Sequence, residues 1–174
     1  MIDLATGRFV LREGVELYPG MKREDFFKSE LYQNELWDER DKDDETTPYY
    51  FIKPQMIDGF EVNLMIWISR YGYIRKIEIT KPEFHEWPNW PKDKSEEEYA
   101  YEIQAYHIAF LKKQIEGCIE EGEDPSFYYT WGSIDTTLSL MHHPDVKLII
   151  EYRQAPILKA LGKVYSFNDI SELF

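Results

Sequence analysis

Hydrophobic and polar residues alternate most clearly between Tyr128 and Tyr152. One parity of the first run holds Tyr128, Thr130, Gly132, Ile134, Thr136, Leu138 and Leu140. After the turn-forming residues His142, His143, Pro144 and Asp145, the alternation resumes with Val146, Leu148, Ile150 and Tyr152. Because successive side chains of a strand point to opposite faces, the pattern predicts two long strands, joined by a turn, with one buried face.

The first half of the chain carries four further strand patterns. They cover residues 8–12, 49–53, 60–69 and 73–80. The pair Asp58-Gly59 stands between the second and third of these and favours a tight hairpin turn. The third alternates throughout, with the core-facing set Phe60, Val62, Leu64, Ile66 and Ile68. These segments predict a strand near the N-terminus and an antiparallel meander.

Two segments have helical periodicity instead. One begins at Arg23, where Lys22 occupies the capping position, and is predicted to end near Gln33 or Asn34. The other begins with Ser95 and Glu98, the arrangement of a capping box, and is predicted to run to Glu121. Its apolar face comprises Ile103, Phe110, Leu111, Ile115 and Cys118. The fold class that follows is α+β, a single domain over residues 1–174 in the order β-α-β-β-β-α-β-β, with the longer helix packed across a mainly antiparallel sheet.

Composition is consistent with one soluble domain. The 174 residues are 43% apolar and include one cysteine, so a core can form and an internal disulfide cannot. The sequence starts without a secretory signal pattern and has no apolar run near the ~20 residues that a bilayer requires. We therefore expect a cytoplasmic protein that does not interact with membranes.

Charge is the most distinctive property of the composition. The chain has 33 acidic and 20 basic residues, a net charge of −13. Such a field repels nucleic acid and attracts a basic protein partner, although acidity also serves solubility alone.

Two acidic stretches are the candidate contacts for such a partner. The stretch from Asp38 to Glu45 has no apolar side chain, which predicts a solvated loop, and it lacks the spacing of an EF-hand calcium site. The second stretch precedes Pro125. The candidate contact residues are Asp38, Glu39, Asp41, Asp43, Asp44, Glu45, Glu120, Glu121, Glu123 and Asp124.

Several aromatic residues are candidates for binding. Trp87 and Trp90 stand in a proline-containing connection and are candidate anchors for a partner. Trp67 and Trp131 lie opposite the apolar sets of their strands. If those strands are neighbours, the second face of the sheet carries an aromatic patch that is either covered by other segments or open for binding.

The sequence contains no recognisable catalytic motif. His107 lies in the middle of the apolar side of the second helix, where a hydrogen-bonded core histidine is the favoured interpretation and a ligand site the alternative. His142 and His143 occupy a turn, and His85-Glu86 lacks the second histidine of a zinc protease motif. Cys118 falls on the buried side of its helix. We therefore expect no metal and no cofactor, and we favour a binding protein over an enzyme.

The chain resembles the small acidic immunity proteins of bacterial polymorphic and contact-dependent toxin systems. The resemblance rests on YPGMKREDFF, residues 18–27, which leads into a helix, and on YTWGSI, residues 129–134, which leads into a hairpin ending in IIEY, residues 149–152. It implies a protein that inhibits a cognate toxin, and it assigns no residue a role.

Charge and resemblance together lead to the favoured hypothesis. The protein would neutralise a basic partner, such as a nuclease toxin, by covering its active cleft with carboxylates that stand in for phosphates. The alternative is a small-molecule or carbohydrate-binding protein, or a hydrolase, that uses the aromatic sheet face and His107.

Overall fold

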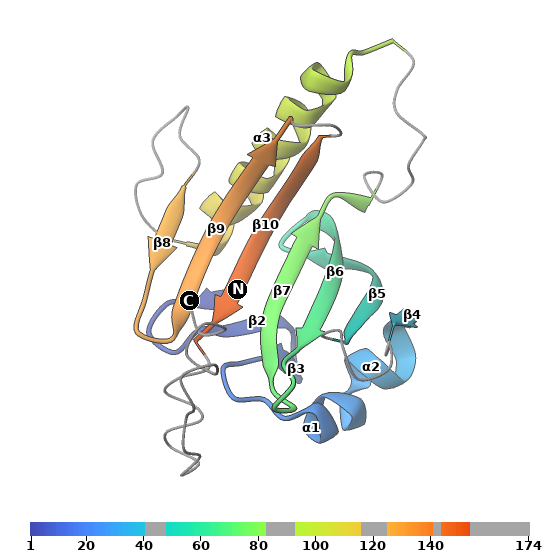
Figure 1. Ribbon diagram of the computed structural model, residues 1–174, viewed down its shortest axis with the longest axis vertical. Helices are drawn as coiled ribbons and strands as arrows, with labels where there is room; N and C mark the ends of the chain where they lie inside the picture. Colours follow the sequence, from blue (N-terminus) through green and yellow to red (C-terminus); the bar gives the residue numbers. More distant parts are fainter. Residues whose placement is uncertain (41–47, 83–92, 116–124, 141–143, 154–174) are drawn as a thin grey trace.

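The protein is an α+β structure in which antiparallel strands dominate (Figure 1). The computed structural model describes residues 1–40, 48–82, 93–115, 125–140 and 144–153. Its helices are α1 (Arg23–Lys28), α2 (Glu30–Glu35) and α3 (Glu96–Gln114). No helix within these ranges is long and apolar enough to cross a membrane.

The strands form two sheets. A small sheet has the order β1-β2-β3, with β1 (Ile2–Asp3), β2 (Arg8–Arg12) and β3 (Val15–Leu17). A seven-stranded sheet has the order β4-β5-β6-β7-β10-β9-β8. Its strands are β4 (Leu36–Arg40), β5 (Tyr49–Ile57), β6 (Phe60–Ile68), β7 (Ile74–Thr80), β8 (Ser126–Tyr128), β9 (Gly132–Ser139) and β10 (Asp145–Tyr152). Every pairing in the large sheet is antiparallel.

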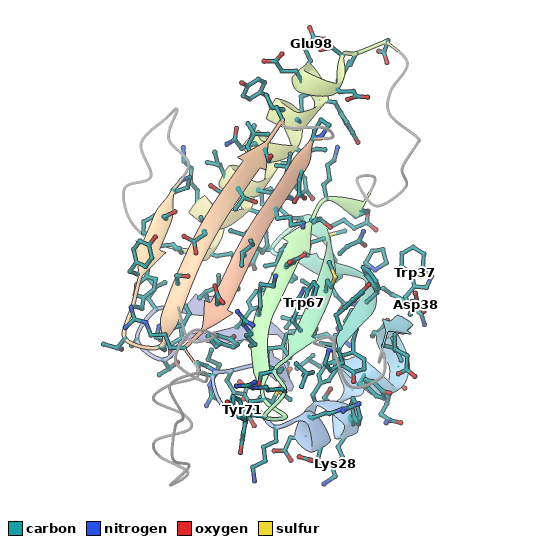
Figure 2. The ribbon with its side chains drawn as sticks, in the orientation of Figure 1. Lys28, Trp37, Asp38, Trp67, Tyr71 and Glu98 are labelled. Carbon is teal, nitrogen blue, oxygen red and sulfur yellow. The ribbon has the colours of Figure 1, made fainter. Side chains whose placement is uncertain are left out.

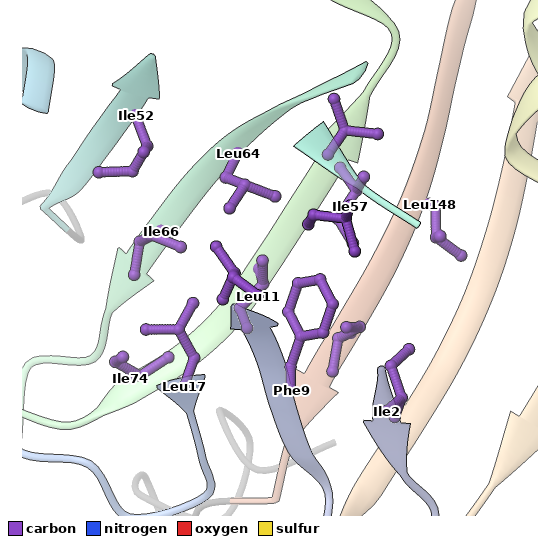
Figure 3. Packing of buried hydrophobic residues seen from close by; sticks show 14 of the residues in the cluster. Ile2, Phe9, Leu11, Leu17, Ile52, Ile57, Leu64, Ile66, Ile74 and Leu148 are labelled. Carbon is purple, nitrogen blue, oxygen red and sulfur yellow. The ribbon is translucent and has the colours of Figure 1, made fainter. Parts of the chain in front are cut away.

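One face of the large sheet is covered by the other elements. The small sheet and α3 lie on the same side of it, and α1 and α2 pack at the β4–β5 end (Figure 1). Side chains of the covered face interdigitate with Phe9, Leu11 and Leu17 of the small sheet (Figure 3). The covered face is lined by fully buried residues, including Leu64, Ile66, Ile77, Ile79, Leu148 and Ile150. This continuous apolar layer is the main core.

The Asp58-Gly59 hairpin and the start of α3 follow the sequence patterns. Asp58 and Gly59 both have positive φ, 49° and 87°, as the tight turn between β5 and β6 requires. At α3, the Ser95 hydroxyl accepts a hydrogen bond from the Glu98 N–H, while the Glu98 carboxylate accepts one from the Ser95 N–H. The predicted capping box is therefore confirmed.

Several predicted boundaries are wrong. The single helix expected from Arg23 is two short helices, because the extended backbone of Ser29 interrupts it and caps α2. The described part of α3 ends at Gln114, whose successor Ile115 has extended backbone, whereas the prediction continued to Glu121. Strands β1, β3 and β4 were not expected.

The long strand predicted to begin at Tyr128 is also wrong, because it is two strands. A turn over Tyr129–Gly132 separates β8 from β9, closed by the Tyr129 N–H donating to the Gly132 carbonyl at 2.8 Å. Gly132 faces the backbone of β10, where an added Cβ would overlap the carbonyl oxygen of Glu151. The predicted buried face does hold for β9 and β10, through Ile134, Leu148 and Ile150.

Candidate functional site

Strand β4 is one edge of the large sheet, and the residues before it fix its position. The Ser29 hydroxyl accepts a hydrogen bond from the Tyr32 N–H at 3.3 Å and donates one to the Phe26 carbonyl at 2.6 Å. These bonds satisfy backbone groups at the break between α1 and α2. Helix α2 then leads directly into β4, so the capped break determines where the edge strand begins.

An aromatic cluster packs α1 and α2 against strand β5. The ring of Phe26, which is fully buried, packs edge-on against Tyr32 and Tyr50, with centroids 5.4 and 5.5 Å apart. Phe27 packs against the same two tyrosines. The Tyr32 hydroxyl then donates a 3.0 Å hydrogen bond to a carboxylate oxygen of Glu39. The side chain of Glu39 is therefore oriented by the core cluster while remaining exposed.

Trp37 is displayed at this edge. The pairing of β4 with β5 shifts register between Leu36 and Asp38, so Trp37 stands at an irregularity where it has no partner residue in β5. Such a bulge redirects a side chain, and that of Trp37 is 59% exposed. Figure 2 shows Trp37 and Asp38 together at the outer edge of the sheet.

The structure corrects the prediction of a loop at Asp38. Asp38 and Glu39 belong to strand β4, paired with Phe51 and Tyr50 of β5. An edge strand accommodates charged side chains because one side of it remains in water, so the absence of apolar residues did not exclude a strand. Both carboxylates are exposed, in agreement with the expectation that they do not enter the core.

The other candidate contacts lie outside the described residues. These are Asp41, Asp43, Asp44, Glu45, Glu120, Glu121, Glu123 and Asp124, together with the candidate anchors Trp87 and Trp90. Cys118, His85, His142 and His143 also lie outside them.

Trp67 lies on the face of the large sheet opposite α3, which we call the open face because no described helix or strand covers it. Its ring packs against that of Tyr49 at 4.7 Å, and the ammonium group of Lys76 lies 4.3 Å from its centroid. The same ammonium is 2.6 Å from the carboxylate of Glu78, which is 3% exposed, and Lys147 lies 3.6 Å from the second oxygen. Lys147 is also 3.1 Å from the carboxylate of Asp145, so this part of the open face is an aromatic and charged cluster in which two lysines neutralise two carboxylates.

Trp131 does not share the open face, which corrects the predicted aromatic patch. It is buried in the main core, stacks on Tyr129 at 5.0 Å and donates a hydrogen bond from Nε1 to the Leu4 carbonyl at 2.8 Å. Trp131 lies in the turn over Tyr129–Gly132 and not in β9. The alternation of side chains between the two faces of β9 therefore does not extend to Trp131. Trp67 and Trp131 consequently lie on opposite sides of the sheet.

His107 is fully buried between α3 and the sheet. Its Nε2 accepts a hydrogen bond from the Lys81 N–H at 3.1 Å, which places the proton of the neutral ring on Nδ1. Burial lowers the pKa of His107 to about 4. A neutral, packed ring that caps the end of β7 matches the favoured interpretation of a core histidine. The amide nitrogen of Gln114 donates to Asp58 at 2.8 Å, while Gln114 Oε1 and His107 Nδ1 are buried without a hydrogen-bond partner among the described residues.

Sequence reasoning missed Trp37 as a candidate. The signal was present, because Leu36-Trp37 is an apolar pair directly before the acidic run and cannot belong to a fully solvated loop without exposing an indole. Trp37 falls between the predicted helix, which ends near Gln33 or Asn34, and the acidic stretch that begins at Asp38, so neither prediction includes it.

Comparison with known proteins gives no match: no family model matches the sequence, no curated protein matches it, and no solved structure matches its fold. Among the described residues, no three potential metal ligands come together. Within the described residues, the β4 edge brings an exposed indole, Trp37, together with the exposed carboxylates of Asp38 and Glu39.

Proposed function

We propose that this chain is a non-enzymatic binding protein that neutralises a basic protein partner, as an immunity protein does for a nuclease toxin. The observation that carries the proposal is the edge strand β4, which displays an exposed tryptophan beside two exposed carboxylates, Asp38 and Glu39. Tryptophan is among the residues that most often dominate the binding energy of protein interfaces.

The charge of the molecule supports the same proposal. A net charge of −13 produces a field that accelerates the approach of a basic protein, and carboxylates can occupy positions that a nuclease provides for phosphates. The Tyr32–Glu39 hydrogen bond holds one of these carboxylates in place, so less side-chain entropy is lost when a partner binds. The proposal places the protein in the cytoplasm, where a delivered nuclease toxin would act.

The competing small-molecule site receives less support. It required His107 and the two sheet tryptophans to contribute to one site. His107 and Trp131 are packed in the interior, and Trp67 lies on the open face with Lys76 over its ring. These three side chains do not converge on one surface, so they do not form one binding site.

The test begins with the neighbouring gene. We expect the gene immediately upstream to encode a large toxin that ends in a basic nuclease domain. The tagged protein should capture that purified domain in low salt, inhibit its nuclease activity, and release it progressively as salt rises, because screening weakens exposed charge pairs. A neighbouring gene for a metabolic enzyme, or a nuclease domain that is neither captured nor inhibited, would overturn the proposal.

Charge reversal locates the contact. The double variant Asp38→Lys/Glu39→Lys should weaken capture at least about tenfold, since each reversal replaces an attraction by a repulsion. The double variant Glu96→Lys/Glu97→Lys is the matched control: both residues are exposed in the first turn of α3, whose start lies far from β4 (Figure 2, where Glu98 is labelled). Equal weakening by the two double variants would show that net charge alone matters.

A further inference from the structure

The two edges of the large sheet differ in how they are protected. Strand β8 has only three residues, follows Pro125 and carries no charge. A very short edge strand next to proline is a common protection against pairing with other chains. Strand β4 has five residues, no proline and an exposed indole, and its protection is the charge of Asp38, Glu39 and Arg40, which a strand of complementary charge would not meet as a barrier. Within the described residues, β4 pairs with β5 alone.

The backbone of β4 is held in an extended form before any partner binds. Beyond the bulge, Glu39 and Arg40 pair regularly with Tyr50 and Tyr49. The strand β5 behind it is buried through Tyr50 and Ile52, and α2 packs against both strands. An added strand would therefore pair with a strand that is already ordered, and β4 would lose little conformational entropy on binding.

The charge of β4 determines which kind of strand can pair with it. Like charges placed opposite each other across two strands are destabilising, and opposite charges are favourable. Strand β4 has two acidic residues, Asp38 and Glu39, and one basic residue, Arg40, so its net charge is negative and favours a basic strand over a second copy of this acidic chain. A strand with lysine or arginine beside Asp38 and Glu39 would be favoured.

We propose that β4 accepts an extended basic segment of the partner as an eighth strand of the large sheet. This inference rests on the proposed function and adds the mode of recognition. Backbone hydrogen bonds to the outer edge of β4 supply affinity, Asp38 and Glu39 select basic side chains, and the indole of Trp37 packs against the incoming strand at its end. Figure 1 shows β4 at the outer end of the sheet, beside α2 and far from α3.

A synthetic peptide tests the mode without the natural partner. The probe is a ten-residue peptide in which lysine or arginine alternates with valine or threonine, added to the full-length ¹⁵N-labelled protein at low salt. The expected result is a set of amide shift changes centred on residues 36–39, with protection of these amides from hydrogen exchange. Changes centred on α3 or β8 would overturn the inference, as would no change at residues 36–39.

Backbone methylation of the same peptide separates strand addition from simple charge attraction. The methylated peptide keeps every charge but cannot donate backbone hydrogen bonds, so it should bind about tenfold more weakly or worse. Equal affinity of the two peptides would overturn strand addition while leaving a charge-driven binding function intact. Failure of the nuclease domain to bind would instead overturn the proposed function, so the two outcomes can be distinguished.

Discussion

At the scale of single residues, His107 shows how burial keeps an imidazole ring neutral. The ring is enclosed by α3 and the sheet, and its acceptor nitrogen binds the Lys81 N–H. Protonation would place a charge in an apolar environment and remove that acceptor, so the pKa of His107 falls to about 4. The sequence predicted the burial from helical periodicity. It could not supply the partner, because Lys81 is 26 residues away.

The pKa of His107 predicts acid sensitivity. An unfolded histidine takes up a proton near pH 6.5 and the folded one only near pH 4, so the unfolded state binds more protons between these values and stability falls as pH falls. The loss should reach roughly 3 kcal/mol by pH 4. His107→Gln retains an acceptor and should lack this component. Urea unfolding of the wild type and of His107→Gln at pH 7 and pH 4 tests this prediction. An equal loss of unfolding free energy in both proteins would contradict it.

Two glycines provide a matched test of the packing of Trp131. Gly7 and Gly14 have nearly the same positive φ, 73° and 74°, so alanine costs about 1 kcal/mol at either position through backbone strain. At Gly7 an added Cβ would also overlap the Trp131 ring, whereas nothing lies within 4 Å at Gly14. Gly7→Ala should therefore destabilise the protein by roughly 1–3 kcal/mol more than Gly14→Ala. Equal losses in thermal or urea unfolding would mean that Trp131 does not pack there.

At the scale of elements, α3 and the β5–β6–β7 meander were predictable because their signals are local. The capping box at Ser95, the Asp58-Gly59 turn and the alternation of β6 each depend on residues close together in sequence. Strands β4 and β8 were not predictable in the same way. An edge strand such as β4 exists because β5 offers it backbone partners, and its own residues carry little strand pattern.

The N-caps of α3 and α1 lead to opposite predictions for stability. Ser95→Ala removes the hydroxyl that caps α3 and should cost about 1 kcal/mol of stability. Lys22 precedes α1 with extended backbone but makes no side-chain cap, so Lys22→Ser should stabilise the protein by about 0.5–1 kcal/mol. Urea unfolding of the two variants should shift the midpoint in opposite directions. A shift in the same direction for both would contradict the assigned caps.

At the scale of the whole molecule, the net charge of −13 leads to the prediction of a basic partner. Composition cannot indicate which of the 33 acidic residues are placed beside an exposed aromatic ring. That depends on the bulge in β4 and on the Tyr32–Glu39 bond, both of which are products of the fold. The fold class was confirmed, whereas Trp37 was recognised as a candidate only in the structure.

The field of the whole molecule should govern the speed of association. The rate constant for binding the proposed basic partner should fall on the order of tenfold between roughly 0.01 M and 0.15 M salt, because the Debye length shortens from about 30 to 8 Å. Stopped-flow measurements across this range test the prediction. A rate that does not change with salt would mean that the net charge of −13 does not steer the encounter.

The most direct test of the β4 edge as the binding site compares the two exposed aromatic residues at the two ends of the sheet. Trp37 on β4 and Tyr128 on β8 are 59% and 74% exposed, so replacing either by alanine should leave the fold intact. In titrations against the proposed partner, a basic nuclease domain, at fixed salt, Trp37→Ala should raise Kd at least about tenfold, while Tyr128→Ala should leave it within about twofold. Unchanged affinity in Trp37→Ala, or a larger loss in Tyr128→Ala, would contradict the assignment of the β4 edge as the binding site.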